Sequence, residues 1–341
     1  MDFSVLQAVK VFSVSIISFL AALLFVPVIT KILFKYQANK QIRTSERAPI
    51  FSQLHQKKSG TPTAGGVIIW GTVILLVIIF WFHPLLNFVD RAQTYLPIAT
   101  ILIAGILGLC DDILGILKIG PHGGGLAVRH KLALYTFVAF IGAVWCYYRL
   151  GWDVLNVPFW GNVSIGWLYI PFFMFIIIAS AFSVNETDGL DGLAGGVMLF
   201  AFSALTVVAF ALGRFSLASF SAAIVGSLLA FLWFNIYPAK FFMGDTGAMA
   251  LGITLGVMAM LTNTALFLPF FAFIPVIESL SVIVQLTSKK LFGRKIFLST
   301  PIHHHFEAIG WPESQITMRF WIVSVVTTMI GLILFFLNRF L

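Results

Sequence analysis

Long apolar runs, separated by short polar segments, recur along the whole 341-residue chain. A helix needs about 20 apolar residues to cross the hydrocarbon core of a bilayer, and the runs are about that long. They predict ten membrane-spanning helices, at residues 12–34, 64–82, 95–117, 131–150, 165–183, 190–212, 216–236, 244–262, 265–291 and 317–338. We therefore expect an all-α polytopic membrane protein that forms a single integral membrane domain over residues 1–341.

Two segments depart from this simple pattern. Turn residues between short apolar stretches at 155–165 favour a small external β-hairpin. The ninth span contains Pro269 and Pro275, which should bend the helix, and Glu278 follows them. Two roles are open for this glutamate: it satisfies polar groups at the bend, or it lines a groove for lipid.

Composition agrees with a membrane protein and excludes several other classes. Nine apolar residue types make up 60% of the chain, only 10% of residues are charged, and mean hydropathy is +1.00. Soluble domains carry roughly a quarter charged residues, so a disordered chain, a secreted disulfide scaffold and a DNA-binding domain are all excluded. The two cysteines form no framework. We expect no nucleic-acid partner, because basic cytoplasmic loops explain the net charge of +8.

Lysine and arginine are distributed unevenly among the loops. The even-numbered loops hold little beyond Arg91, Arg149 and Arg214. Odd-numbered loops hold most of the positive charge, namely Lys35, Lys40, Arg43, Arg47, Lys57, Lys58, Lys118, Arg129, Lys131, Lys240, Lys289, Lys290, Arg294 and Lys295. By the positive-inside rule the odd loops are cytoplasmic, so both termini are expected outside.

The scarce acidic residues gather beside the odd loops, and the first group is a pair. Asp111 and Asp112 lie toward the end of the third span. A carboxylate at membrane depth costs about 2.5–3.5 kcal/mol, so such residues usually belong to functional sites. Two adjacent carboxylates also repel each other, which requires a protonated member or a nearby cation. The alternative is a solvated pair without a function, just beyond the membrane edge.

A second group lies where the fifth and sixth spans meet. Asn185, Glu186, Asp188 and Asp191 occur within seven residues, among glycines that allow a ligand close to the backbone. If the sixth span begins near Asp188, then Asp188 and Asp191 share one helix face at i,i+3. Capping of the helix start is the alternative for one of these aspartates.

The third group, residues 235–247, opens the eighth span. Asp245 either caps that helix or supplies oxygen to a hard divalent cation, as carboxylates at phosphate sites usually do. Phe241 and Phe242 are expected to pack in the core, although either could stack on a base.

Two further groups are basic. His303, His304 and His305 are adjacent, which rarely closes a zinc site, so contact with phosphate or nucleotide is at least as reasonable. Residues 57–66 combine lysine, hydroxyls and glycine at a helix start, which suits an anion cradle, although the spacing is not that of a P-loop. With Lys58 and Lys131 facing the acids, the five groups predict one cytoplasmic site for Mg²⁺ and phosphates.

Five stretches in this order resemble the phospho-N-acetylmuramoyl-pentapeptide transferase family, within the polyprenyl-phosphate sugar-1-phosphate transferase superfamily. They are residues 58–66, 111–112, 185–192, 235–245 and 301–306. The resemblance implies transfer of phospho-MurNAc-pentapeptide from UDP-MurNAc-pentapeptide to undecaprenyl phosphate, giving lipid I and UMP with Mg²⁺ as cofactor. It also implies a homodimer in the bacterial inner membrane, with the active site on the cytoplasmic face.

Site residues follow from the resemblance position by position. It implies that Asp245 is the Mg²⁺ ligand, that Asp111 and Asp112 lie near the lipid phosphate, one serving as base, and that Phe242 lies beside the uracil. Further contacts to the nucleotide sugar are implied for Lys58, Thr63, Asn185, Asp188, Asp191, Asn235 and Gly244. Apart from the resemblance, we expect lysines and histidines of the basic groups to hold the pyrophosphate, namely Lys131, His303, His304 and His305. The family usually has a lysine three residues after the second aspartate; here that position is Gly115, and Lys118 comes three residues later.

Three other functions compete with this interpretation. A sister enzyme that transfers GlcNAc-1-phosphate to a polyprenyl phosphate would share most of the motifs, but the histidine run 303–305 favours the first family. An ion-coupled transporter would need polar groups spread along a path through the bilayer. A binding or scaffold role leaves the clustered acids without a purpose.

Overall fold

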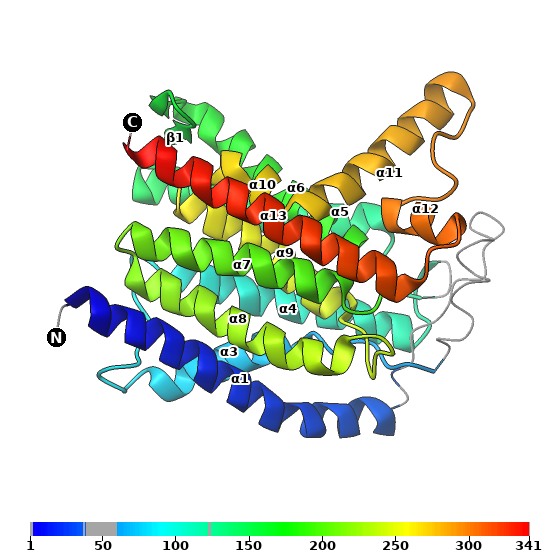
Figure 1. Ribbon diagram of the computed structural model, residues 1–341, viewed down its shortest axis with the longest axis horizontal. Coiled ribbons are helices and arrows are strands. Elements are labelled where there is room, and N and C mark those ends of the chain that lie inside the picture. The colour runs from blue at the N-terminus through cyan, green and yellow to red at the C-terminus, as the bar shows by residue number, and fades with distance from the viewer. Residues whose placement is uncertain (1–2, 37, 39–59, 122–123, 341) are drawn as a thin grey trace.

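The computed structural model describes residues 3–36, 38, 60–121 and 124–340, and most of them are helical (Figure 1). Lys58 lies outside these described residues. In the described part, eight helices are long and apolar enough to cross a membrane. They are α1 (Phe3–Lys35), α4 (Tyr95–Ile116), α5 (Val128–Val144) continued by η3 (Trp145–Arg149), α6 (Tyr169–Thr187) preceded by η4 (Gly166–Leu168), α7 (Leu193–Ala211), α8 (Phe215–Asn235), α9 (Gly244–Leu261) and α13 (Glu313–Phe340).

The remaining two predicted spans are irregular. The apolar helix α3 (Val67–Phe80) has 14 residues, and the ninth span consists of η5 (Ala265–Phe267), α10 (Leu268–Phe271) and α11 (Phe273–Phe292). The two halves of the ninth span meet at 92°. Pro275 explains the break, because it lacks the N–H that would bond to the carbonyl of Phe271 and its ring crowds that carbonyl. The predicted bend is confirmed, and the described residues contain all ten predicted segments as helices.

The helices form a bundle around α9, the most deeply buried of them. Figure 1 shows α1, α3 and α8 along one side of the bundle and α7 and α13 toward another, whereas α11 leans away from it. The short helix α12 (Ile302–Ala308) connects α11 to α13. Small residues allow the closest contacts: a Cβ atom at Gly226 of α8 would lie 2.1 Å from the Ser15 carbonyl oxygen of α1.

One such contact positions the candidate site. A Cβ atom at Gly108 of α4 would lie 2.3 Å from the carbonyl oxygen of Asp245, in the first turn of α9. Any side chain at this position would therefore push the two helices apart. Glycine at 108 lets the last turns of α4, which carry Asp111 and Asp112, lie directly against the beginning of α9.

The expected hairpin is present at the opposite end of the bundle. β1 (Val154–Val157) pairs with β2 (Gly161–Ser164) in antiparallel register, with Asn156 opposite Asn162. Asn338 of α13 donates to the Asn156 side chain at 3.0 Å and fastens the hairpin to the bundle. Figure 1 places the hairpin and both chain ends at one end of the molecule and α12 at the other. Which end faces the outside stays a prediction.

Candidate active site

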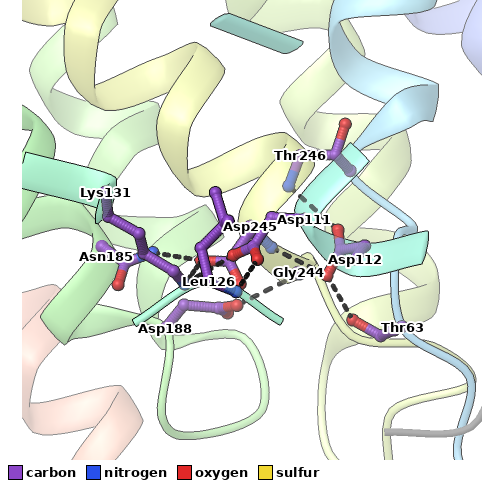
Figure 2. Close-up of polar contacts among 10 residues, drawn as sticks. All are labelled: Thr63, Asp111, Asp112, Leu126, Lys131, Asn185, Asp188, Gly244, Asp245 and Thr246. Atoms are coloured by element: carbon purple, nitrogen blue, oxygen red, sulfur yellow. Dashed lines mark hydrogen bonds and ion pairs between the residues drawn. The ribbon is translucent and has the colours of Figure 1, made fainter. Parts of the chain in front are cut away.

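One lysine joins acids that lie far apart in the sequence (Figure 2). Lys131 Nζ, from the first turn of α5, lies 2.8 Å from Asp111 Oδ2 and 2.6 Å from Asp245 Oδ1. The exposed fraction of the side chain is 1% for Asp111, 13% for Lys131 and 25% for Asp245. The cation offsets the repulsion between the two carboxylates, and Asp245 is the acid of this pair that solvent or a ligand can reach.

Two more groups orient these carboxylates. The Asn185 side-chain amide, near the end of α6, donates to Asp245 Oδ1 at 2.6 Å. The backbone N–H of Leu126 donates to Asp111 Oδ1 at 2.5 Å. Helices α4, α5, α6 and α9 thus each contribute to one polar cluster, as predicted from the separate motifs.

Asp112 is held differently from its neighbour Asp111. The backbone N–H groups of Asp245 and Thr246 donate to its two carboxylate oxygens at 3.2 and 3.0 Å, and the Thr63 hydroxyl donates at 3.3 Å (Figure 2). The positive end of the α9 dipole therefore stabilises this buried anion. The repulsion expected between the two adjacent aspartates is relieved because Lys131 serves one and the helix start serves the other.

Gly244 makes this arrangement possible. Its φ of +74° is in the left-handed region that favours glycine. A Cβ atom there would lie 2.6 Å from both Asp112 Oδ2 and Thr63 Oγ1. The predicted site residue Gly244 thus acts by leaving room for the side chains around it.

The prediction that Asp188 and Asp191 share a helix face is wrong. α6 ends at Thr187 and α7 begins at Leu193, so both aspartates lie in the turn between the helices. Gly192, with φ +75°, keeps the backbone of this turn out of the helical region.

Both aspartates instead join the turn to the segment that opens α9. Asp188 Oδ2 accepts a hydrogen bond from the Gly244 N–H at 3.1 Å, and Asp191 Oδ2 accepts one from the Ala239 N–H at 3.0 Å. Asn235 completes the connection, since its oxygen accepts from the Gly192 N–H at 3.1 Å. These contacts give all three predicted site residues a structural role at the edge of the acid cluster.

The two phenylalanines of this segment differ in exposure. Phe241 is 1% exposed and packs in the core, whereas Phe242 is half-buried. The backbone of Phe242 is fixed by donation to the Pro62 carbonyl at 2.8 Å. Of the two, Phe242 is therefore the one that a planar base could reach.

The histidine run is mostly buried. His303 Nδ1 lies 3.0 Å from Glu278 Oε2, and His304 Nδ1 lies 2.6 Å from Glu307 Oε2. His305 is half-buried and accepts a hydrogen bond from the Leu298 N–H at 3.3 Å. Burial would lower the pKa of the His303 imidazole, but the Glu278 carboxylate outweighs burial and raises that pKa above its usual value.

Glu278 is the residue whose role the sequence left open. Its partner His303 is 25 positions away, on another helix, and no local pattern connects the two. The structure pairs Glu278 with this histidine, which neither of the two sequence-based roles included.

Among the described residues, no three or more His, Cys, Asp and Glu side chains are arranged to hold a metal ion by themselves. Mg²⁺ is usually held by one or two carboxylates, with substrate phosphates and water completing its shell. Asp245, with a partly exposed carboxylate beside Asp111, offers the hard oxygen ligands that this mode requires. The residues present therefore fit a Mg²⁺ ion that binds together with a phosphorylated substrate.

Known proteins with similar sequences agree with this geometry. Residues 94–263, which include α4 through α9, match the model of glycosyl transferase family 4. A phospho-N-acetylmuramoyl-pentapeptide-transferase from Clostridium novyi is 38% identical over 328 residues, which cover 95% of this chain and 96% of that protein. This chain belongs to the phospho-N-acetylmuramoyl-pentapeptide transferase family.

Relatives with the same name come from other bacteria. The transferase of Clostridium perfringens is 39% identical over 93% of this chain and 96% of its own length, and that of Geobacillus kaustophilus is 37% identical over 93% and 95%. The sequence-based identification of the family is confirmed. As a member of this transferase family, the chain is an enzyme, a phosphosugar transferase and a multi-pass membrane protein.

Proposed function

We propose that this enzyme transfers phospho-MurNAc-pentapeptide from UDP-MurNAc-pentapeptide to undecaprenyl phosphate, giving lipid I and UMP in a Mg²⁺-dependent reaction. The observation that carries the proposal is that Lys131 joins Asp111 and Asp245, two acids that stand in the family's motif positions. We place the reaction at the cytoplasmic face of the bacterial inner membrane, because the acidic motifs lie next to the basic odd-numbered loops in the sequence. We also propose a homodimer, in keeping with the family resemblance.

The proposed chemistry is one displacement at phosphorus. An oxygen of the ionised carrier phosphate attacks the β-phosphorus of the UDP-sugar, the bond from that phosphorus to the bridging oxygen breaks, and UMP leaves. Asp245, with Asp111 nearby, would hold Mg²⁺, and the bound ion would neutralise negative charge on the pyrophosphate. Lys131 orients both carboxylates and adds positive charge where the leaving phosphate develops negative charge.

The partners of the two aspartates, an ion pair and several hydrogen bonds, favour this direct route over a phospho-aspartate intermediate. Both oxygens of Asp111 are engaged, by Leu126 and Lys131, and both oxygens of Asp112 accept backbone N–H groups at the start of α9. A carboxylate that acts as nucleophile would have to give up these partners. Neither aspartate is therefore well placed for attack, whereas both are well placed to orient other groups.

The test uses purified protein with UDP-MurNAc-pentapeptide, undecaprenyl phosphate and Mg²⁺. We expect UMP release together with a lipid product of the mass of lipid I. Absence of both, alongside an active relative as control, contradicts the proposal, and conversion of UDP-GlcNAc instead assigns the chain to the sister family. Incubation with β-³²P-labelled substrate without lipid should leave the protein unlabelled, because the direct route forms no phospho-enzyme.

A further inference from the structure

A second buried pair of titratable groups lies beside the acid cluster, where the bent span α11 meets α12. Glu278 Oε2 is 3.0 Å from His303 Nδ1 and accepts a hydrogen bond from the His303 backbone N–H at 3.4 Å. Both side chains are at most 1% exposed. Loss of either partner would leave the other buried and unpaired, which is costly. The pair therefore fixes α12 relative to α11.

The other edge of the His303 ring lies against the turn that carries two acids of the site. A Cβ atom at Gly189 would lie 2.2 Å from His303 Nε2, so the ring fills the space that a side chain would need. Gly189 follows Asp188 directly, and Asp191 comes two residues later. Both carboxylates bond to backbone N–H groups within residues 235–245. A displaced ring would therefore move the backbone between the two aspartates.

Neighbouring contacts keep this ring and its glutamate in place. The Ser279 hydroxyl donates to the Ser183 hydroxyl at 2.7 Å, which fastens α11 to α6, the helix that leads into the turn. The ring centroids of His303 and His304 are 4.0 Å apart. Because the surroundings are packed, rotation of His303 away from Gly189 would require several side chains to move.

We propose that Glu278 and His303 are positioning residues for the transfer reaction. The pair links α11 to the turn 188–191 and holds that turn in the geometry that accepts the nucleotide sugar. This inference rests on the proposed function, because the turn matters for turnover only if the UDP-sugar binds there. His303 is fully buried, so its ring acts through Gly189 and not by touching phosphate.

Kinetics distinguish a positioning role from general loss of stability. We expect His303→Ala to raise the KM for UDP-MurNAc-pentapeptide about 10-fold or more, and to change the KM for undecaprenyl phosphate less than about 2-fold. Glu278→Gln keeps an oxygen that can accept from Nδ1, so it should retain most activity, whereas Glu278→Leu should resemble His303→Ala. Equal changes in both KM values, or Glu278→Gln as damaging as Glu278→Leu, overturn the proposal.

A double-mutant cycle tests the contact with Gly189 directly. Gly189→Ala inserts a methyl group into the ring and should lower kcat/KM on the order of 100-fold, as small misplacements in active sites do. Adding His303→Ala removes the clash, so the double variant should be at least as active as Gly189→Ala alone. Gly71→Ala in α3, whose methyl group would have the Phe25 and Val67 side chains as its nearest neighbours, is the matched control and should leave activity unchanged.

The outcome distinguishes an error in the proposed positioning role from an error in the proposed function. If the wild type is active and the effects of Gly189→Ala and His303→Ala on kcat/KM multiply independently, only the positioning role is contradicted. An inactive wild type contradicts the proposed function, and the same cycle is then measured as the apparent melting temperature in detergent, which needs no substrate. Coupled shifts there support the contact between His303 and Gly189, and additive shifts overturn it.

Discussion

Lys131 Nζ lies 2.6 Å from Asp245 Oδ1, although 114 positions separate the two residues. The contact brings the first turn of α5 to the first turn of α9, and Asp111 on α4 joins it at 2.8 Å. These ion pairs therefore connect α4, α5 and α9 at one polar centre, which apolar packing alone would not create. The family's transfer chemistry needs charge to be stabilised at a fixed point, and this contact provides such a point.

Removal of that cation should affect catalysis strongly. Lys131→Met leaves Asp111 and Asp245 without their shared partner, so we expect kcat to fall on the order of 100-fold or more. UMP release under saturating substrates measures the effect. Lys118→Met, at an exposed lysine after α4, is the matched control and should stay within about 2-fold of wild type. Comparable losses in both variants would argue for a general effect of positive charge.

Metal dependence should be traceable to Asp245. We expect EDTA to abolish UMP release, added Mg²⁺ to restore it, and Asp245→Asn to remain inactive at every Mg²⁺ concentration, because an amide is a weak ligand for this hard cation. Asp153→Asn, in the hairpin region that lies away from the acid cluster, is the control and should respond to Mg²⁺ like wild type. An Asp245→Asn enzyme that high Mg²⁺ rescues fully would show that the ligand is another residue.

Packing of α1 against α8 should tolerate no added volume. A methyl group at Gly226 would meet the Ser15 carbonyl oxygen of α1, so Gly226→Ala should destabilise the protein by about 1–3 kcal/mol. The apparent melting temperature in detergent measures this change. Leu229→Ala on the same helix alters a 42%-exposed side chain and should cost clearly less. The reverse order would contradict the close approach of these two helices.

Stability should depend on pH through His303. The pKa of this histidine is raised in the folded protein, because the attraction of Glu278 outweighs the effect of burial. The protonated histidine therefore contributes its full stabilising free energy below the pKa of the unfolded state, about 6.5, and this free energy is lost as pH rises through the pKa of the folded state. The apparent melting temperature should therefore fall between mildly acidic pH and alkaline pH. Glu278→Gln should flatten this part of the curve. Parallel curves for the two proteins would show that the pair does not cause the dependence.

Membrane orientation can be tested with single cysteines. Cys110 is exposed and Cys146 buried, so Cys110→Ser provides a background without accessible thiols. In it, Trp160→Cys in the hairpin, at an 86%-exposed position, should react with a membrane-impermeant maleimide in intact cells. Lys118→Cys, at the exposed position that follows α4, should react only after permeabilisation. The opposite pattern would reverse the orientation inferred from the basic loops.

Local properties of the sequence were enough to predict most of the fold. The ten spans and the hairpin at 155–165 were predicted because apolar length and turn chemistry belong to contiguous residues. Pro269 and Pro275 likewise predicted the bend in the ninth span, since the effect of proline on a helix is local. The 92° angle, by contrast, depends on the helices around α10 and α11.

The sequence predicted which residues belong to the site but not which of them contact one another. Motifs placed Asp111, Asp245 and Lys131 near helix ends on one face, because positive charge in loops reports sidedness. The prediction that Asp188 and Asp191 share a helix face was wrong because Gly192 ends the turn in a left-handed conformation, which residue spacing alone does not reveal.

By itself, the sequence determined a ten-span transferase whose few acids gather beside one set of loops. Tertiary structure decided which partner each acid has: Lys131 for Asp111 and Asp245, the start of α9 for Asp112, and His303 for Glu278. The physical reason is the distance along the chain over which each kind of interaction acts. Hydrophobicity and turn preference act between neighbours in the chain, whereas buried charges find partners only where close helix contacts, such as the one at Gly108, bring distant segments together.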